Sequence, residues 1–205
     1  MKLGLRVEEK KIIRTKANLI MWRNRMSEKP RFLKEFEVWE KKRKIAELFR
    51  EALEAENRNE YGIAKKKLDE IMELSKDEFP EIYFEACFKL AEVLFEEENY
   101  RGSIKCALRA ICNVPNKDLY LVGIKRIRDM LFILKEQGNL SVFRENMEPI
   151  YRLLKDNEEL QAFVQGLISI AEGKKDITKY LNSIRTPELK EALELLLKPH
   201  QRFSL

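Results

Sequence analysis

Apolar residues recur every three or four positions along most of this chain, which is the spacing of an amphipathic α-helix. No run of alternating β-branched residues bounded by turn residues indicates a strand. The pattern predicts a long helix over residues 31–56. Its apolar face is expected to comprise Phe32, Phe36, Trp39, Ala46, Phe49 and Leu53. Further helices are predicted within residues 63–74, 77–99, 100–115, 117–138, 141–156, 158–175, 176–184 and 186–199.

Proline and glycine mark the ends of these helices. Pro30 cannot continue a preceding helix, and Gly138 and Gly173 are residues of the kind that end one. Pro149 should kink or divide the helix predicted over residues 141–156. Thr186 is expected to cap the last helix, with Pro187 in its first turn.

The corners between helices are evenly spaced. Tyr61, Tyr100 and Leu140 occupy equivalent places, 39 and 40 residues apart. Equivalent residues follow each corner at three fixed offsets. Three residues after the corner lie Ala64, Ser103 and Phe143; seven residues after it lie Leu68, Ala107 and Met147; ten residues after it lie Ile71, Ala110 and Ile150. A fixed period of this size predicts an α-solenoid, in which each helix pair buries its apolar face against its neighbours.

The predicted fold is therefore all-α and forms one domain over residues 1–205. It comprises a basic N-terminal helix in residues 1–30, about four antiparallel helix pairs over residues 31–184 and a C-terminal capping helix over residues 185–198. A tail follows over residues 199–205.

One unit, residues 84–117, resembles a tetratricopeptide repeat. Its first helix carries Cys87, Leu90, Ala91 and Leu94 at the positions where that family has a bulky residue, Leu, a small residue and another bulky residue. Its second helix carries Tyr100, Ser103, Ala107, Ala110 and Pro115 at the family's aromatic, small and closing positions. The flanking units match only in part, and the period exceeds the family's 34 residues, so a HEAT-like array is the competing interpretation. Either resemblance implies stacked helix pairs with a concave surface.

Composition supports a folded helical protein. Hydrophobic residues make up 44% of the 205 residues and charged residues 37%, with only 7 Gly and 6 Pro. Abundant Lys and Glu with scarce Gln and His resemble proteins of thermophilic organisms. No apolar run is long enough to span a membrane, and the N-terminus lacks the apolar block of a signal peptide, so a cytoplasmic location without membrane association is expected.

The chain offers little for catalysis. Its one histidine, His200, lies in the tail, and no HExxH, GxGxxG, P-loop or GxSxG motif occurs. Three cysteines without a CxxC pair indicate buried thiols. The carboxylates of Glu92, Glu96, Glu97 and Glu98 are read as a solvated helix end. No catalytic site, cofactor or metal is predicted, and the protein is expected not to be an enzyme.

The predicted function is non-catalytic binding of another protein or peptide segment on the concave face. In stacked helix pairs the first helices line that face. The candidate contacts are Tyr83, Lys89, Tyr120, Lys125, Arg126 and Arg128. The alternative for the cations is a charged helix face around a buried Ile127.

Basic charge is concentrated at the front of the chain. Residues 1–44 hold 15 Lys or Arg and 6 Asp or Glu, a net charge of +9, whereas the remainder carries −4. The alternative function is therefore nucleic-acid binding through phosphate contacts. Its candidate residues are Lys10, Lys11, Arg14, Arg23, Arg25, Lys41, Lys42, Arg43 and Lys44. A further hypothesis concerns residues 6–26, whose apolar side chains would either cap the first helix pair or form a homo-oligomer.

Overall fold

The computed structural model describes residues 31–198, and every regular element in that range is a helix. The elements are α2 (Arg31–Asn57), α3 (Tyr61–Ser75), α4 (Pro80–Glu96), α5 (Tyr100–Cys112), α6 (Lys117–Glu136), the 3-10 helix η1 (Asn139–Arg144), α7 (Glu148–Leu153), α8 (Glu158–Ala171), α9 (Thr178–Ser183) and α10 (Pro187–Leu197). The all-helical prediction is confirmed for this range. The predictions for residues 1–30 and 199–205 lie outside the described residues.

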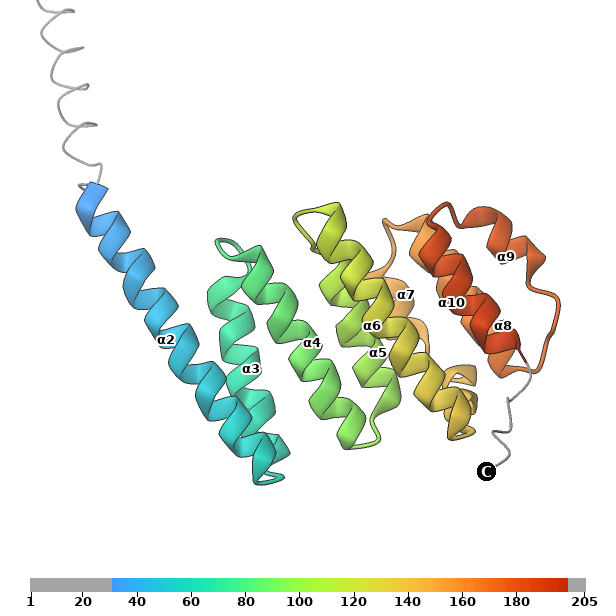
Figure 1. Cartoon of the computed structure of the whole chain (residues 1–205), viewed down its shortest axis with the longest axis horizontal. Helices are drawn as coiled ribbons and strands as arrows, with labels where there is room; N and C mark the ends of the chain where they lie inside the picture. Colours follow the sequence, from blue (N-terminus) through green and yellow to red (C-terminus); the bar gives the residue numbers. More distant parts are fainter. Residues whose placement is uncertain (1–30, 199–205) are drawn as a thin grey trace, which may run out of the picture. The chain divides into compact units, whose positions relative to one another are not determined.

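The chain divides into two units, residues 1–44 and residues 45–205. In the second unit the consecutive helices α3, α4, α5 and α6 run in alternating directions, each packed on the next (Figure 1). Asparagine side chains cap three helix starts: Asn99, Asn116 and Asn157 each accept a hydrogen bond from the backbone N–H three residues later. Short polar corners therefore set where each helix begins.

The helix ends repeat one conformation. Asn59, Glu98, Gly138 and Gly173 have φ values of 58°, 59°, 74° and 85°, in the left-handed region. After three of these helices the next N–H returns to a carbonyl five residues earlier, as in a Schellman motif: Glu60 to Ala55 at 2.8 Å, Asn99 to Leu94 at 2.8 Å and Lys174 to Ser169 at 2.9 Å. The first three left-handed residues each lie two positions before Tyr61, Tyr100 and Leu140, so the corner spacing read from the sequence is also a spacing of backbone conformation.

The residues that follow these corners are buried. All nine aligned positions, from Ala64 to Ile150, are 7% exposed or less. The small ones bring α4 and α5 into extensive contact, with Ser103, Ala107 and Ala110 fully buried. The hydroxyl of Ser103 donates a hydrogen bond of 2.7 Å to the Ala91 carbonyl, so this buried polar group is satisfied within the helix pair.

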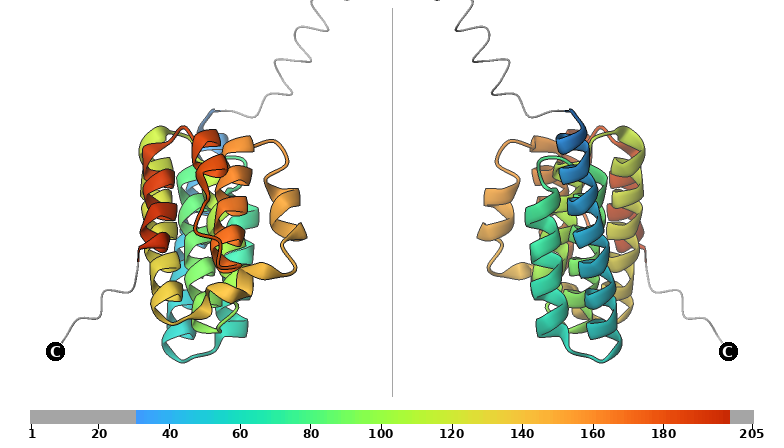
Figure 2. Two further views of the ribbon diagram at one scale, coloured as in Figure 1. Left: turned by 90° about the vertical axis from the view of Figure 1, so that its right-hand side faces the viewer. Right: turned by 90° about the vertical axis from the view of Figure 1, so that its left-hand side faces the viewer.

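α6 packs against α5 on one side and α10 on the other. A Cβ atom at Gly123 would lie 2.2 Å from Cγ2 of Ile111, so glycine is what allows α6 to approach α5. Figure 2 shows α6 (yellow) and α10 (red) side by side along one edge of this unit. The buried Lys135 of α6 donates to the carbonyls of Leu195 and Lys198 at 3.1 and 2.6 Å, closing the end of α10.

The third helix pair departs from regular geometry. Where one helix was predicted over residues 141–156, the chain forms η1 and then the six-residue α7, with Pro149 in the first turn of α7. The division at Pro149 was expected. Thr186 is the N-cap residue of α10 and Pro187 lies in its first turn, as predicted, but the Thr186 side chain makes no capping hydrogen bond. Instead Glu159 of α8 accepts hydrogen bonds from the backbone N–H groups of Arg185 and Thr186.

The apolar face predicted for α2 is also wrong. In the second unit the buried residues of α2 are Ile45, Leu48, Ala52 and Ala55, whereas Ala46 and Leu53 are exposed and Phe49 is half-buried. In the first unit Phe32, Phe36 and Trp39 are 67%, 53% and 55% exposed. Leu33 and Val38 are also exposed, at 40% and 38%, so this part of the helix buries none of its large apolar side chains.

Candidate functional site

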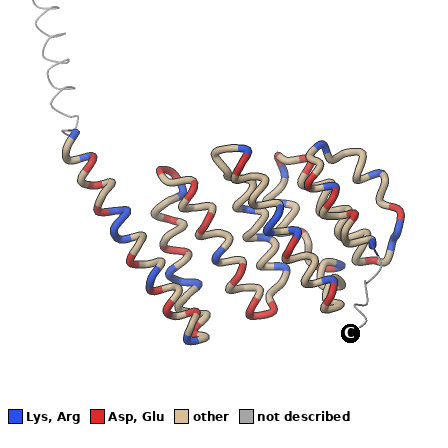
Figure 3. The backbone as a smooth tube through the Cα atoms, viewed as in Figure 1, with Lys and Arg blue, Asp and Glu red and all other residues tan. Residues whose placement is uncertain are grey.

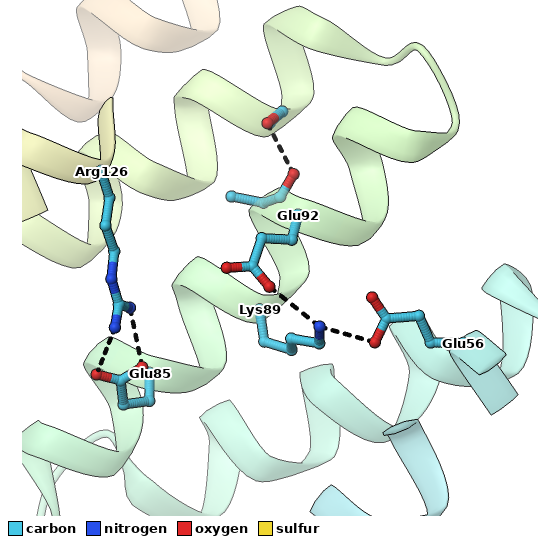
Figure 4. A network of polar contacts seen from close by, with 7 residues as sticks. Glu56, Glu85, Lys89, Glu92 and Arg126 are labelled. Carbon is cyan, nitrogen blue, oxygen red and sulfur yellow. Dashed lines mark hydrogen bonds and ion pairs between the residues drawn. The ribbon is translucent and has the colours of Figure 1, made fainter. Parts of the chain in front are cut away.

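The six predicted partner contacts lie on α4 and α6, and the structure gives two of the cations a role between helices. The ammonium group of Lys89 lies 2.8 Å from Oε2 of Glu56 on α2 and 3.0 Å from Oε2 of Glu92 (Figure 4). Partial burial acts to lower the pKa of Lys89, but the hydrogen bonds from both carboxylates raise it above its ordinary value. Lys89 therefore links α2 to α4.

Arg126 links α4 to α6 in the same way. Its guanidinium contacts both carboxylate oxygens of Glu85, at 2.9 and 3.3 Å (Figure 4). It also lies over the rings of Phe84 and Phe88, 5.6 and 5.1 Å from their centroids. A bidentate pair combined with aromatic contact fixes the guanidinium between two helices.

The two tyrosines are half-buried between helices. Burial raises the pKa of Tyr83 to about 12, with Cys87 and Arg109 nearby. Burial likewise raises the pKa of Tyr120 to about 12, and its hydroxyl lies near Thr186. Both rings pack against the hydrophobic core and remain partly exposed.

Lys125 and Arg128 lie together in an open depression between α6 and α10. Its volume is about 290 Å³, and its lining consists of Leu121, Val122, Ile124, Lys125, Arg128 and Glu188. Lys125 and Val122 are exposed. Arg128 contacts Asp129 at 2.9 Å and Glu191 of α10 at 4.0 Å. Apolar walls and an exposed ammonium group therefore meet at one place on the surface.

Sequence reasoning missed four of the six residues that line this depression. Val122 could have been found, because it precedes Lys125 by three residues and so shares its helix face. Glu188 follows Lys125 by 63 residues, and no local pattern predicts that α10 lies beside α6.

The nucleic-acid candidates fall in two groups. Lys10, Lys11, Arg14, Arg23 and Arg25 lie outside the described residues. Lys41, Lys42, Arg43 and Lys44 form a continuous run on α2. The guanidinium of Arg43 lies 5.4 Å from the centroid of the Trp39 ring. An exposed aromatic therefore adjoins the basic run.

Charge changes sign along the chain. Residues 45–100 hold 7 Lys or Arg and 16 Asp or Glu, a net charge of −9, and residues 101–205 hold 18 and 13, a net charge of +5. Figure 3 shows acidic positions recurring along α3 and α4 and at their corners. The depression on α6 thus belongs to the basic half of the second unit, while the Lys89 pairs lie in its acidic half.

The cysteines Cys87 and Cys106 are buried, and Cys112 is half-buried. Desolvation raises the pKa of Cys87 to about 12 and that of Cys112 to about 11, which keeps both thiols protonated. No cluster of three or more potential metal ligands occurs among the described residues. Of the predicted acidic group, Glu92 pairs with Lys89, and Glu97 pairs with Lys65 at 2.6 Å.

None of the helices in residues 31–198 has the length and apolar character needed to cross a membrane. Comparison with known proteins gives no relationship: no protein-family model matches the chain, and no curated protein or solved structure is significantly similar to it. What can be stated of its class is that residues 31–198 form an all-helical array of packed helices.

Proposed function

We propose that this chain is a non-catalytic protein-interaction scaffold built on a tetratricopeptide-like solenoid. The left-handed corner residues at positions 59, 98, 138 and 173 support a repeating arrangement of helix pairs. The burial of Ala64, Ser103 and Phe143 at one aligned position supports the same repeat. Since each pair in such an array contacts mainly its neighbours, an extended surface is left open for a partner.

The observation that carries this proposal is the depression between α6 and α10. Leu121, Val122 and Ile124 supply apolar surface, and Lys125 supplies an exposed positive charge. That combination suits an acidic peptide segment carrying one apolar side chain, because the side chain is desolvated while a carboxylate pairs with the ammonium group. Lys89 and Arg126 then act by holding neighbouring helices in place, and Lys125 makes the contact.

The test is capture of partners by the full chain from an extract of the source organism, with and without nuclease. Lys125→Glu reverses the charge in the depression. Lys66→Glu reverses a matched exposed cation on α3, away from the depression. We expect a protein that is retained by the native chain and by Lys66→Glu, lost with Lys125→Glu and insensitive to nuclease. Equal recovery with the two variants would refute the assignment of this surface.

Nucleic-acid binding is the second candidate, and the observation in its favour is the basic run of α2 beside Trp39. Charge-dominated binding weakens steeply with salt, because each phosphate contact releases counterions. A mobility-shift titration with single- and double-stranded probes at low and moderate salt tests it. A shift that is lost at moderate salt, and reduced when Lys41, Lys42, Arg43 and Lys44 are replaced by Gln, is the expected result. The absence of any shift at low salt would exclude it.

A further inference from the structure

An exposed aromatic stripe occupies the first half of α2. Phe32, Phe36 and Trp39 are more than half exposed, and the rings of Phe36 and Trp39 stack with their centroids 6.0 Å apart. The three residues follow each other at intervals of four and three, so they lie on one side of the helix. Contiguous apolar surface that faces solvent in this way marks a contact site for another molecule.

Arg43 continues this stripe as a cation. It follows Trp39 by four residues, is exposed, and places its guanidinium 5.4 Å from the centroid of the Trp39 ring. Lys42 follows Trp39 by three residues, so the two cations adjoin one ring. An aromatic ring that stacks on a base and a cation that contacts a phosphate are the two parts of a single-strand binding surface.

The carboxylates of this segment lie nearer to the start of the stripe. Oε1 of Glu35 accepts a hydrogen bond of 2.8 Å from Nε of Arg31, so its charge is paired within the helix. Glu40 follows Phe36 by four residues and adjoins that ring. Residues 31–44 hold 6 Lys or Arg and 3 Glu, a net charge of +3, and four of the cations form the run that follows Trp39. Phosphate contact is therefore expected at the Trp39 end of the stripe.

The position of Arg43 distinguishes between the candidate occupants. A helix that lies in a membrane surface carries its cations on the face opposite its aromatic residues. A partner helix requires a continuous apolar seam, and Arg43 takes the next position of that seam after Trp39. A single-stranded nucleic acid offers bases for stacking and phosphates for pairing, so it engages both the rings and the cations.

We infer that a single-stranded nucleic acid binds along this side of α2, with bases stacked on Phe36 and Trp39 and phosphates paired with Lys42 and Arg43. The inference rests on nucleic-acid binding, the second candidate function above, and adds to it the class of nucleic acid. The bases of a duplex are stacked on each other, so a duplex reaches the cations but leaves the rings uncovered.

Fluorescence of Trp39 tests the inference in the full-length chain. The chain has 2 tryptophans, so Trp22→Phe leaves Trp39 as the one reporter. At low salt an oligothymidylate should quench Trp39, because a base stacks on its indole ring. The matching oligothymidylate–oligoadenylate duplex should bind without quenching it. Fluorescence anisotropy of labelled probes gives the affinity for each.

Substitutions separate stacking from charge. Trp39→Ala should weaken binding of the oligothymidylate by about tenfold or more, the effect of one lost base contact, and leave the affinity for the duplex unchanged. Trp39→Phe should restore part of the affinity. Val38→Ala, which removes an exposed apolar side chain from another side of the same helix, should change neither affinity.

The other outcomes differ in what they remove. If Trp39→Ala leaves the affinity for both probes unchanged, binding is through phosphates alone and the inference is overturned, while nucleic-acid binding stands. If neither probe binds at low salt, both are excluded. A shift of Trp39 emission to shorter wavelength with phosphatidylserine vesicles, without any response to the oligothymidylate, would assign the stripe to a membrane surface. A dimer in sedimentation that shields Trp39 from the oligothymidylate would assign it to a second copy.

Discussion

Substitution of Gly123 by alanine tests the packing of α6 on α5 at its closest point. A methyl group there would lie 2.2 Å from Cγ2 of Ile111, 3.2 Å from Cε2 of Phe84 and 3.4 Å from Cε2 of Phe88. All three neighbours are 2% exposed or less, so none can swing into solvent. Ile111 is also β-branched and holds one χ1 rotamer in a helix.

Two effects of opposite sign determine how Gly123→Ala changes the free energy of unfolding. Alanine is favoured over glycine in a helix interior by about 1 kcal/mol. Relieving the contact requires a movement of about 1.3 Å to restore a normal carbon–carbon distance near 3.5 Å, and overpacking of a core costs about 1–3 kcal/mol. Because the closest neighbour is rotamerically fixed, we expect the upper part of that range and a net destabilisation of about 1–2 kcal/mol.

Urea unfolding followed by circular dichroism measures this difference as a lower midpoint at an unchanged slope. Gly62→Ala on α3 is the matched control, because nothing lies within 4 Å of the methyl group it adds. That variant should be stabilised by about 0.5 kcal/mol, since alanine restricts the unfolded chain. If Gly123→Ala is as stable as Gly62→Ala, α6 does not approach α5 as described.

Three further predictions concern corners, buried thiols and the last helix. Glu98→Gly should stabilise the fold and Gly138→Ala destabilise it, each by about 1 kcal/mol in urea unfolding, because both positions have a left-handed backbone. Burial raises the pKa of Cys87 to about 12 from an ordinary value of 9.0. The stability that its neutral thiol contributes is therefore complete below about pH 9 and is lost as the pH rises above that value, by about 1.4 kcal/mol per pH unit. Thermal melts from pH 8 to 10.5 should show a smaller decline for Cys87→Ala than for the native chain. Lys135→Met leaves two carbonyls without their donor and should speed deuterium exchange in α10.

The sequence allowed the helix boundaries to be predicted because their determinants are local. Pro80 and Pro187 sit in first turns, and Gly138 and Gly173 follow helix ends with positive φ. The repeat spacing could also be read, since each corner combines a left-handed residue with a half-buried Tyr or Leu two positions later. The 3-10 geometry of η1 carries no comparable signal.

The open face of α2 could not be predicted, because hydropathy alone favours the larger side chains. Periodicity selected Phe32, Phe36 and Trp39, whereas the second unit buries Ile45, Leu48, Ala52 and Ala55 on its part of the helix. Ala52 and Ala55 let a neighbouring helix pack closely against α2. A hydropathy pattern gives such small residues little weight compared with Phe or Trp.

The ion pairs of Lys89 and Arg126 join helices that are distant in the sequence. Glu85 and Arg126 are 41 residues apart, close to the period of 39 to 40, and Glu56 and Lys89 are 33 apart. Residues separated by about one period fall on adjacent first helices in a stack of helix pairs, so opposite charges at that offset tie neighbours together. Lys89 and Arg126 are thus engaged in ion pairs within the chain. Glu85 precedes Lys125 by 40 residues, but its carboxylate pairs with Arg126. Lys125 instead lines the depression beside α10. Reversal of the Lys125 charge is therefore the sharpest test of the proposed binding surface.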